Sequence, residues 1–274
     1  MPPRTQSYSP IAILTDFGYR DHYVGVMKGV IASIAPKATI IDITHGVPPQ
    51  SIVAGAIALG ESWRFFPKRT IFLAVVDPGV GTARAPIAVE TRAGARFVGP
   101  DNGLLSIAAE AAGVRHVVRL ESPRFRLAKT SSTFHGRDIF APAAAFIARG
   151  TPLASLGPAI GSIQPLKLPK PAISLDRVRG EVIYIDGYGN LVANITRESI
   201  ARLTASFPGK PVSVRIENGA SMKIFNTYGD APAGTILATF GSFELLEIAV
   251  RDGSAAERFG CGLGATVVAR VTRA

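Results

Sequence analysis

The chain has 274 residues, 47% of them hydrophobic, which is enough to bury a substantial core in one large domain or two smaller ones and argues against disorder. Its formal net charge of +10 is scattered, without the aromatic interleaving of RNA-binding sheets, so we expect no nucleic-acid partner. No apolar run approaches the roughly 20 residues of a membrane span, and the N-terminus resembles neither a secretory signal nor a transit peptide, so we expect no membrane contact.

Short apolar runs alternate with helical periodicity over about the first 165 residues. The expected elements, in chain order, are strand Ile11–Leu14, helix Tyr23–Ile34, strand Thr39–Ile43, helix Ser51–Phe65, strands Thr70–Val76, Ala85–Thr91 and Arg96–Val98, helix Leu104–Ala112, strand Val114–Leu120 and helix Ile139–Ala148. This alternation predicts an α/β fold in which a mainly parallel sheet carries helices on both faces.

The pattern changes after the proline-rich passage Pro152–Pro171, which is typical of a linker. The runs beyond it are short and separated by turn residues: Arg179–Ile185, Leu191–Ile195, Val212–Ile216, Met222–Phe225, Thr235–Thr239, Leu245–Val250 and Ala265–Val271. They predict a small antiparallel barrel or sandwich over about the last 100 residues.

Acidic residues follow several of the expected strands of the first part. Asp16, Asp77 and Asp101 each come directly after an apolar run. Because the carboxyl ends of parallel strands share one edge of a sheet, the three are expected to converge on a ligand site there. Helix capping is the alternative for acids that precede helices, and we expect Asp21 to cap the helix that begins at Tyr23.

The segment Asp77–Arg84 carries the groups best suited to catalysis. It joins a carboxylate, two glycines and a guanidinium at the end of a buried strand, and His135 lies in a second polar cluster, Thr133–Asp138. If the two segments meet, Asp77, Arg84 and His135 form a charged triad able to hold and polarise a water molecule.

Other site chemistries have little support. The four histidines show no metal spacing, the single Cys261 permits neither a thiolate site nor an internal disulfide, and no G-x-S-x-G elbow is present. Gly79-Val80-Gly81 is only a fragment of a dinucleotide loop. We therefore expect no metal, and the lone cysteine fits a cytoplasmic location.

Two turns of the second part also carry polar groups. Asp186–Asn190 joins two expected strands, either as a glycine-assisted hairpin turn or as a holder of an amino-acid head group. Gly241-Ser242-Phe243-Glu244 has the backbone groups and the aromatic ring to hold a flat base.

Taken together, these segments resemble the S-adenosyl-L-methionine (SAM) hydroxide adenosyltransferases, the adenosine-forming relatives of the SAM-dependent fluorinase and chlorinase. The motifs that carry the resemblance span nearly the whole chain: Thr15–Gly18 with Asp21, Tyr23–Gly25, Asp42–His45, Asp77–Gly81, Gly99–Gly103, Phe134–Asp138, Asp186–Asn190, Thr227-Tyr228 and Leu246–Ala249. The resemblance implies a Rossmann-like domain over residues 1–165, a β-barrel domain over residues 175–274 that helps to bind adenine and methionine, and a homotrimer with SAM between subunits.

The resemblance also implies site residues. Asp77, Arg84 and His135 correspond to the hydrolases' catalytic set, whereas the halogenases have Tyr at the first and third of these positions and the fluorinase has Ser at Gly136. The implied substrate-binding residues are Asp16, Asp21, Thr133, Phe134, Asp186, Asn190, Phe225, Ser242 and Phe243. Glu244 stands where relatives usually have Gly.

The function expected from these residues is hydrolysis of SAM to adenosine and L-methionine by in-line attack of water at C5′ of the ribose. SAM is the substrate and no cofactor is implied. A carboxylate such as Asp77 repels a halide, which argues against the alternative of a chlorinase. The other alternative is a non-catalytic SAM or adenosine sensor.

Overall fold

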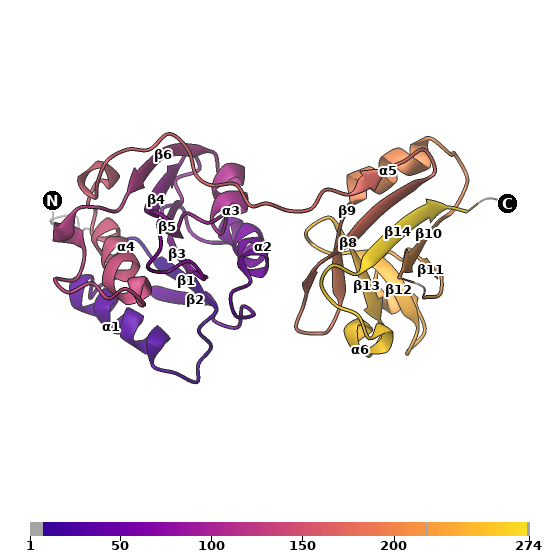
Figure 1. Cartoon of the computed structure of the whole chain (residues 1–274), viewed down its shortest axis with the longest axis horizontal. Coiled ribbons are helices and arrows are strands. Elements are labelled where there is room, and N and C mark those ends of the chain that lie inside the picture. The colour runs from indigo at the N-terminus through magenta and orange to yellow at the C-terminus, as the bar shows by residue number, and fades with distance from the viewer. Residues whose placement is uncertain (1–7, 218, 273–274) are drawn as a thin grey trace, which may run out of the picture. The chain divides into compact units, whose positions relative to one another are not determined.

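The computed structural model describes residues 8–217 and 219–272 (Figure 1). The chain divides into two compact units, the first ending at Lys167 and the second beginning at Leu168, and each is described by itself. None of the helices in the described ranges combines the length and the apolar character needed to cross a bilayer.

The first unit is built on a mostly parallel sheet. Its strands, within the described part of the chain, are β1 (Ile11–Thr15), β2 (Ile40–Thr44), β3 (Ile71–Val75), β4 (Pro86–Thr91), β5 (Arg96–Pro100) and β6 (Val114–Arg119). Their order is β2-β1-β3-β5-β4-β6, and only β4 runs against its two neighbours, β5 and β6. Four residues, 92–95, connect β4 to β5, which suits a hairpin and is far too short for a parallel crossover.

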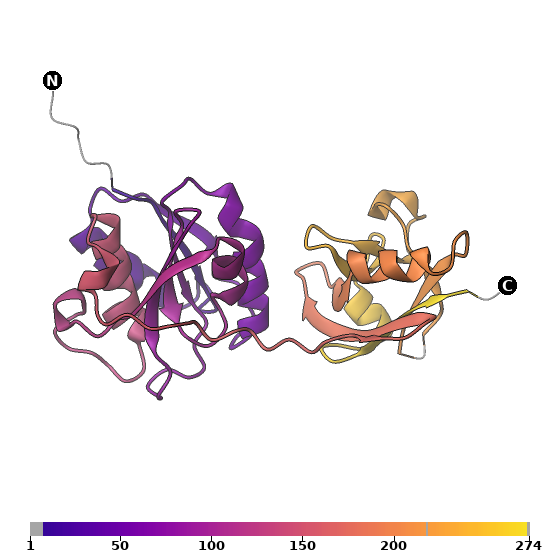
Figure 2. The ribbon, with the colours of Figure 1, turned by 90° about the horizontal axis from the view of Figure 1, so that it is seen from above.

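Helices cover both faces of this sheet (Figures 1 and 2). They are α1 (Tyr23–Ile34), α2 (Ile52–Ser62), α3 (Ser106–Ala111) and α4 (Ala141–Ala148). α1 packs with α4 on one face and α2 packs with α3 on the other. β1 and β3 are buried along their whole length, which is why their sequences are unbroken apolar runs.

The second unit is an antiparallel sheet that curls into a nearly closed barrel. Its described strands are β7 (Ala172–Ile173), β8 (Arg177–Ile185), β9 (Leu191–Thr196), β10 (Val212–Ile216), β11 (Met222–Lys223), β12 (Ile236–Phe240), β13 (Leu245–Val250) and β14 (Thr266–Val271). The order is β11-β10-β14-β8-β9-β13-β12, with β7 beside β8, and a bridge from Ile224 to Ala238 connects the two end strands. The fold class expected from the sequence is confirmed in both units.

Two helices of the second unit are absent from the expected elements: α5 (Arg197–Ala205) and α6 (Ala255–Phe259). Each begins at a side-chain cap, because Thr196 accepts a hydrogen bond from the Ser199 amide and Ser254 accepts one from the Glu257 amide. The S-x-x-E spacing at Ser254 is the sequence signal that would have identified α6.

The passage expected to be a linker is largely packed on the first unit. Leu153 and Leu156 are buried, Ala159 bridges to Val118 on β6, and the Leu166 amide donates to the Ser106 hydroxyl. The prolines of this passage therefore limit regular structure without freeing the chain from the unit's surface.

Candidate active site

A tightly bonded group of three side chains lies beyond the carboxyl end of β3. Arg84 donates from Nε to Asp77 Oδ1 at 2.9 Å and from Nη2 to Asp77 Oδ2, which makes a two-pronged ion pair. The same Nη2 lies 2.7 Å from His135 Nδ1, and the guanidinium carbon sits 5.2 Å from the centre of the Phe140 ring. Side-chain exposure is only 9% for Arg84 and 6% for Asp77, so water screens this pair weakly.

Glycine allows the two segments to approach each other. Gly81 has φ +77°, and a Cβ added there would lie 2.6 Å from the Ser132 carbonyl oxygen. Any side chain at this position would therefore push the Asp77–Arg84 turn away from the loop that carries His135.

A buried carboxylate secures the His135 loop. Asp138 is fully buried and accepts hydrogen bonds from the Ser131 amide and from Arg137 Nε and Nη2. Burial alone would raise the pKa of Asp138, but these donors outweigh it and hold that pKa below its usual range. The bond from Ser131 to Asp138 thus closes the loop that carries His135, and the loop leads into the π-helical turn Gly136–Phe140.

His135 is neutral at neutral pH and has a defined tautomer. Burial lowers its pKa, and the positive charge of Arg84 lowers it further. A guanidinium has only donors, so Nδ1 must accept from Arg84 and the ring proton must sit on Nε2. The free ring nitrogen of His135 is therefore a donor.

A cavity of about 390 Å³ lies next to this group. Five predicted site residues line it: Asp16, Asp77, Thr133, Phe134 and His135. Part of its wall is aromatic, since Phe134 meets Phe17 and Tyr23 edge to face at 6.0 and 5.1 Å between ring centres. Arg84 does not line this cavity; with Ala83 and Ala85 it lines a separate hollow, and it reaches the cavity through its bonds to Asp77 and His135.

The loop that carries Asp16 is held from two sides. Asp16 Oδ2 accepts from the Gln50 amide at 2.7 Å, and Gln50 adopts φ +64°, an uncommon conformation for this residue type. The Thr15 hydroxyl lies 2.7 Å from Nδ1 of His45, whose carbonyl accepts from the Gly18 amide. Contacts with the loop that follows β2 therefore hold Asp16, whose side chain lines the cavity.

His45 is buried at the centre of this support. Its Nε2 lies 3.2 Å from Asp42 Oδ1, a contact that is too poorly aligned to be a regular hydrogen bond. Burial lowers the pKa of His45 more than the nearby Asp42 carboxylate raises it, so the ring is neutral at neutral pH. Asp42 in turn accepts from Lys28 and Tyr19.

Two acids of the first unit are placed differently from the expectation. Asp101 lines a separate hollow, where its Oδ1 accepts from the Gln164 amide, and so it does not converge with Asp16 and Asp77. Asp21 does not cap α1: the N-cap residue is His22, which makes no side-chain cap bond, and Asp21 is exposed outside the cavity. Asp21 lies one residue before the N-cap position, so its carboxylate does not cap the first turn of α1.

In the second unit, Asp186 and Asn190 form one rigid turn. Asp186 Oδ1 accepts from the amides of Tyr188 and Asn190 at 2.9 Å, and its Oδ2 accepts from Asn190 Nδ2 at 2.8 Å. Both residues line a hollow of about 510 Å³ together with Tyr228. The turn is therefore both a hairpin turn and the wall of a concave surface.

The other predicted substrate-binding residues of that unit are Phe225, Ser242 and Phe243, of which Phe243 is the one expected at adenine. Phe225 packs on a small apolar cluster of Ala231, Leu237 and Ala249, Ser242 is exposed and Phe243 is half-buried. Glu244, which follows them, has φ +57°, a conformation that favours glycine. The backbone thus explains why glycine suits this position.

Several residues that shape the site carried no individual prediction: Phe17, Tyr23, His45, Gln50 and Phe140. Phe17, Tyr23 and His45 lie within motifs that the sequence singled out, so their neighbours were the signal, whereas Gln50 acts through its amide, which any residue type supplies. In residues 8–217 and 219–272, no three or more His, Cys, Asp or Glu side chains form a group that could hold a metal ion.

Comparison with known proteins gives consistent results. Residues 11–157 match the model of the SAM hydroxide adenosyltransferase N-terminal domain, and residues 180–268 match that of the C-terminal domain. The (R)-S-adenosyl-L-methionine hydrolase of Salinispora arenicola is 40% identical over 90% of this chain and 92% of its own length. A crystal structure of an uncharacterized conserved protein from Thermotoga maritima has a TM-score of 0.84 at 39% identity, covering 94% of this chain and 99% of its own. A fluorinase from an Actinoplanes species is more distant, at 29% identity over 70% of this chain and 73% of its own.

Proposed function

This chain belongs to the SAM hydroxide adenosyltransferase family, and from that premise we propose that it hydrolyses (R)-S-adenosyl-L-methionine to adenosine and L-methionine. The observation that carries the proposal is the bonding of Arg84 to both Asp77 and His135 beside a cavity that also contains Asp16. This is the residue set expected for water as the nucleophile, and it contains a carboxylate where a halide would be repelled.

The reaction is a displacement at C5′ of the ribose. A water oxygen forms the new bond to C5′ while the C5′–S bond breaks, its electron pair stays on sulfur, and one water proton is released. Methionine leaves as a neutral thioether, so the leaving group needs no general acid and the reaction needs no cofactor. The protein's task is to orient the water in line with the C5′–S bond and to accept its proton.

The bonding pattern supports a division of roles within the triad. The Nε2–H of His135 donates to the water oxygen, because Nδ1 is engaged by Arg84. Asp77 is then the group with lone pairs available to accept the water's proton, since a carboxylate offers about four acceptor positions and Arg84 uses two. The charge of Arg84 stabilises the hydroxide character that develops on the oxygen.

The other site residues are assigned by family resemblance. Asp16 binds the ribose hydroxyls, and Thr133 and Phe134 line the ribose pocket, which agrees with their shared cavity. Asp186 and Asn190 bind the methionine end, Phe243 with the neighbouring backbone binds adenine, and Asp21, Phe225 and Ser242 complete the substrate contacts. The first unit thus supplies the water site, and the second unit contributes to binding adenine and methionine.

The proposal extends to assembly and location. By resemblance the protein is a homotrimer with SAM bound between subunits, so light scattering should give about three times the chain mass of 28.8 kDa. A cytoplasmic location is supported by the lone cysteine, Cys261.

The direct test incubates the purified protein separately with the two sulfonium epimers of SAM and separates the products by chromatography. Adenosine and methionine should form in equal amounts, and faster from the (R) epimer. In ¹⁸O-labelled water the label should enter the 5′-hydroxyl of adenosine. Label-free adenosine would contradict displacement at C5′, and 5′-chloro-5′-deoxyadenosine formed at high chloride would indicate a halogenase.

A further inference from the structure

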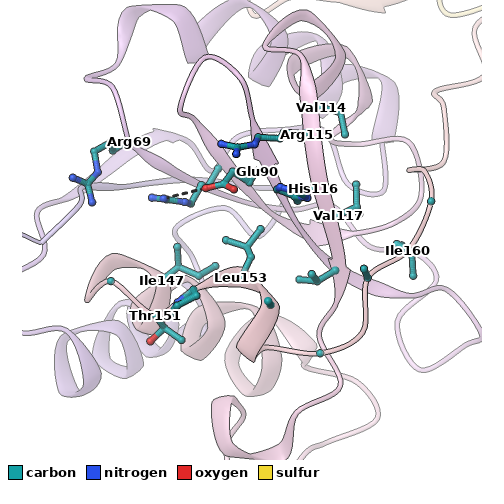
Figure 3. A pocket seen from close by; sticks show the side chains of 18 residues that line it. Arg69, Glu90, Val114, Arg115, His116, Val117, Ile147, Thr151, Leu153 and Ile160 are labelled. Carbon is teal, nitrogen blue, oxygen red and sulfur yellow. Dashed lines mark hydrogen bonds and ion pairs between the residues drawn. The ribbon is translucent and has the colours of Figure 1, made fainter.

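The first unit has a second cavity, of about 710 Å³, near the amino ends of its parallel strands (Figure 3). Arg69 and Arg96 lie where the parallel strands β3 and β5 begin, whereas Asp16 and Asp77 follow the ends of β1 and β3. The cavity is therefore separated from the candidate active site by the length of the strands, and the proposed reaction does not use it.

Three arginines give this cavity a positive charge. Arg69, Arg96 and Arg115 line it together with a single carboxylate, Glu90, so the formal net charge of the lining is +2 with His116 neutral. Glu90 is already engaged, because its Oε1 lies 3.3 Å from Arg96 Nη2.

Arg96 is incompletely bonded. Its Nε is buried and has no hydrogen-bond partner among the residues that the structure describes. Buried donors in folded proteins usually have a hydrogen-bond partner, so Arg96 is only partly satisfied by the described residues. The Arg96 side chain as a whole is 21% exposed and lines the cavity, and a guanidinium binds planar or tetrahedral oxyanions well.

The wall facing these charges is apolar. Figure 3 shows Arg115 and Glu90 on one side of the cavity and Ile147 and Leu153 on the other. A cavity of this size and mixed lining is typical of small-molecule sites, which hold an organic body against apolar side chains and fix its polar end with a few charged groups.

From these features we propose that this cavity binds a small organic phosphate. The formal charge of +2 matches a phosphate monoester, which carries about −1.5 to −2 at pH 7, better than it matches a single carboxylate. The phosphate accepts from Arg96 and Arg115, with Arg69 at the rim, and the organic body lies on Ile147 and Leu153.

The experiment is a calorimetric titration of the full-length protein with three probes. Phenyl phosphate should bind most tightly, inorganic phosphate more weakly because it lacks the apolar body, and benzoate more weakly because it carries one charge. Arg96→Gln and Arg115→Gln should each weaken phenyl phosphate binding at least tenfold. Arg64→Gln, a change at an exposed arginine outside the cavity, should alter it less than twofold.

Two further variants keep the proposal falsifiable. Arg115 is exposed, so its variant tests the site even if Arg96→Gln fails to fold. Arg84→Gln, once circular dichroism shows that it is folded, should leave phenyl phosphate binding unchanged, and loss of binding in that folded variant alone would place the anion at the triad. No binding to the wild-type protein, or equal binding to all variants, would also overturn the proposal. None of these readouts depends on SAM turnover.

Discussion

The parallel strands of the first unit have one candidate site at their carboxyl ends, here called the carboxyl edge, and another at their amino ends, the amino edge. An arginine is bonded differently in each. At the carboxyl edge Arg84 has its partners inside the protein, with Asp77 on two nitrogens, His135 on one of the same nitrogens and Phe140 against its face. At the amino edge Arg96 touches one carboxylate through Nη2 and leaves its buried Nε unbonded within the described residues. The Arg84 guanidinium is held by protein partners before any ligand binds, whereas the Arg96 guanidinium is only partly bonded within the described residues.

This difference matches what each site would bind. A water nucleophile and a cationic substrate cannot neutralise a guanidinium, so Arg84 needs its carboxylate in place before the substrate arrives. An anionic ligand can pair with the exposed part of the Arg96 guanidinium, so Arg96 needs only weak bonding within the protein. The bonding of each arginine in the free protein is therefore consistent with a cationic substrate near Arg84 and with the anionic ligand proposed near Arg96.

Conservative replacement of the two arginines should separate the edges by activity. Arg84→Lys keeps the charge but cannot hold both oxygens of Asp77 and His135 at once, so turnover of SAM should fall by roughly 10²–10⁴-fold. The matched change Arg96→Lys should leave turnover within about threefold. Adenosine formation measured by chromatography checks both, and equal losses would mean that the two edges are not independent.

Removal of Arg84 and removal of Arg96 should lower the free energy of unfolding by different amounts. Arg84→Met leaves the nearly buried Asp77 carboxylate without its partner, and breaking a buried pair from one side costs about 3–5 kcal/mol in the free energy of unfolding. Arg96→Met removes an incompletely bonded guanidinium and should cost about 1 kcal/mol or less. Chemical denaturation of the two variants, followed by fluorescence of Trp63 in the first unit, would show whether this ranking holds.

Acid should destabilise the first unit through His135 and His45, which lie near the carboxyl ends of its strands. The pKa values of His135 and His45 are lowered in the folded protein, chiefly by burial, so below about pH 6.5 the unfolded chain binds more protons than the folded chain. The free energy of unfolding is therefore unaffected above that pH and falls as the pH drops below it, by at most about 1.4 kcal/mol per pH unit for each histidine.

The contribution of His45 to this slope can be separated from that of His135. His45→Gln should reduce the pH dependence of unfolding between pH 6.5 and 5 to the part that His135 contributes, and His116→Gln, at an exposed ring, is the control substitution. A profile identical in all three proteins would show that burial of His45 does not control acid stability.

Sequence patterns predicted what depends on burial. The bounds expected for α1 and β13 agree with the structure because their apolar periodicity begins and ends with the element. α5 was missed because its sequence, RESIARLTA, is mostly polar and its few buried residues resemble a turn between strands. Capping residues, rather than hydrophobicity, define that helix.

The site was predictable to the extent that each group follows a strand end. Asp16 and Asp77 share a cavity for that reason, but Asp101 obeys the same rule and faces elsewhere, since the side-chain direction depends on the Gln164 contact 63 residues along the chain. The support of Asp16 by the Gln50 amide has no residue-type signature at all. The unbonded Nε of Arg96 likewise exists only in three dimensions.

An exposed ion pair in the second unit should give the smallest change in stability of these variants. Arg197 and Glu244 form a pair whose side chains are 52% and 61% exposed, in contrast to the nearly buried pair of Asp77 and Arg84. Glu244→Gln removes the charge and keeps the side-chain size and the φ +57° backbone, so the free energy of unfolding should fall by less than about 1 kcal/mol, with a smaller loss at high salt. Denaturation at low and high ionic strength measures the effect. A loss as large as that of Arg84→Met would mean that burial is not what distinguishes the two pairs, because an exposed pair is solvated before and after the change.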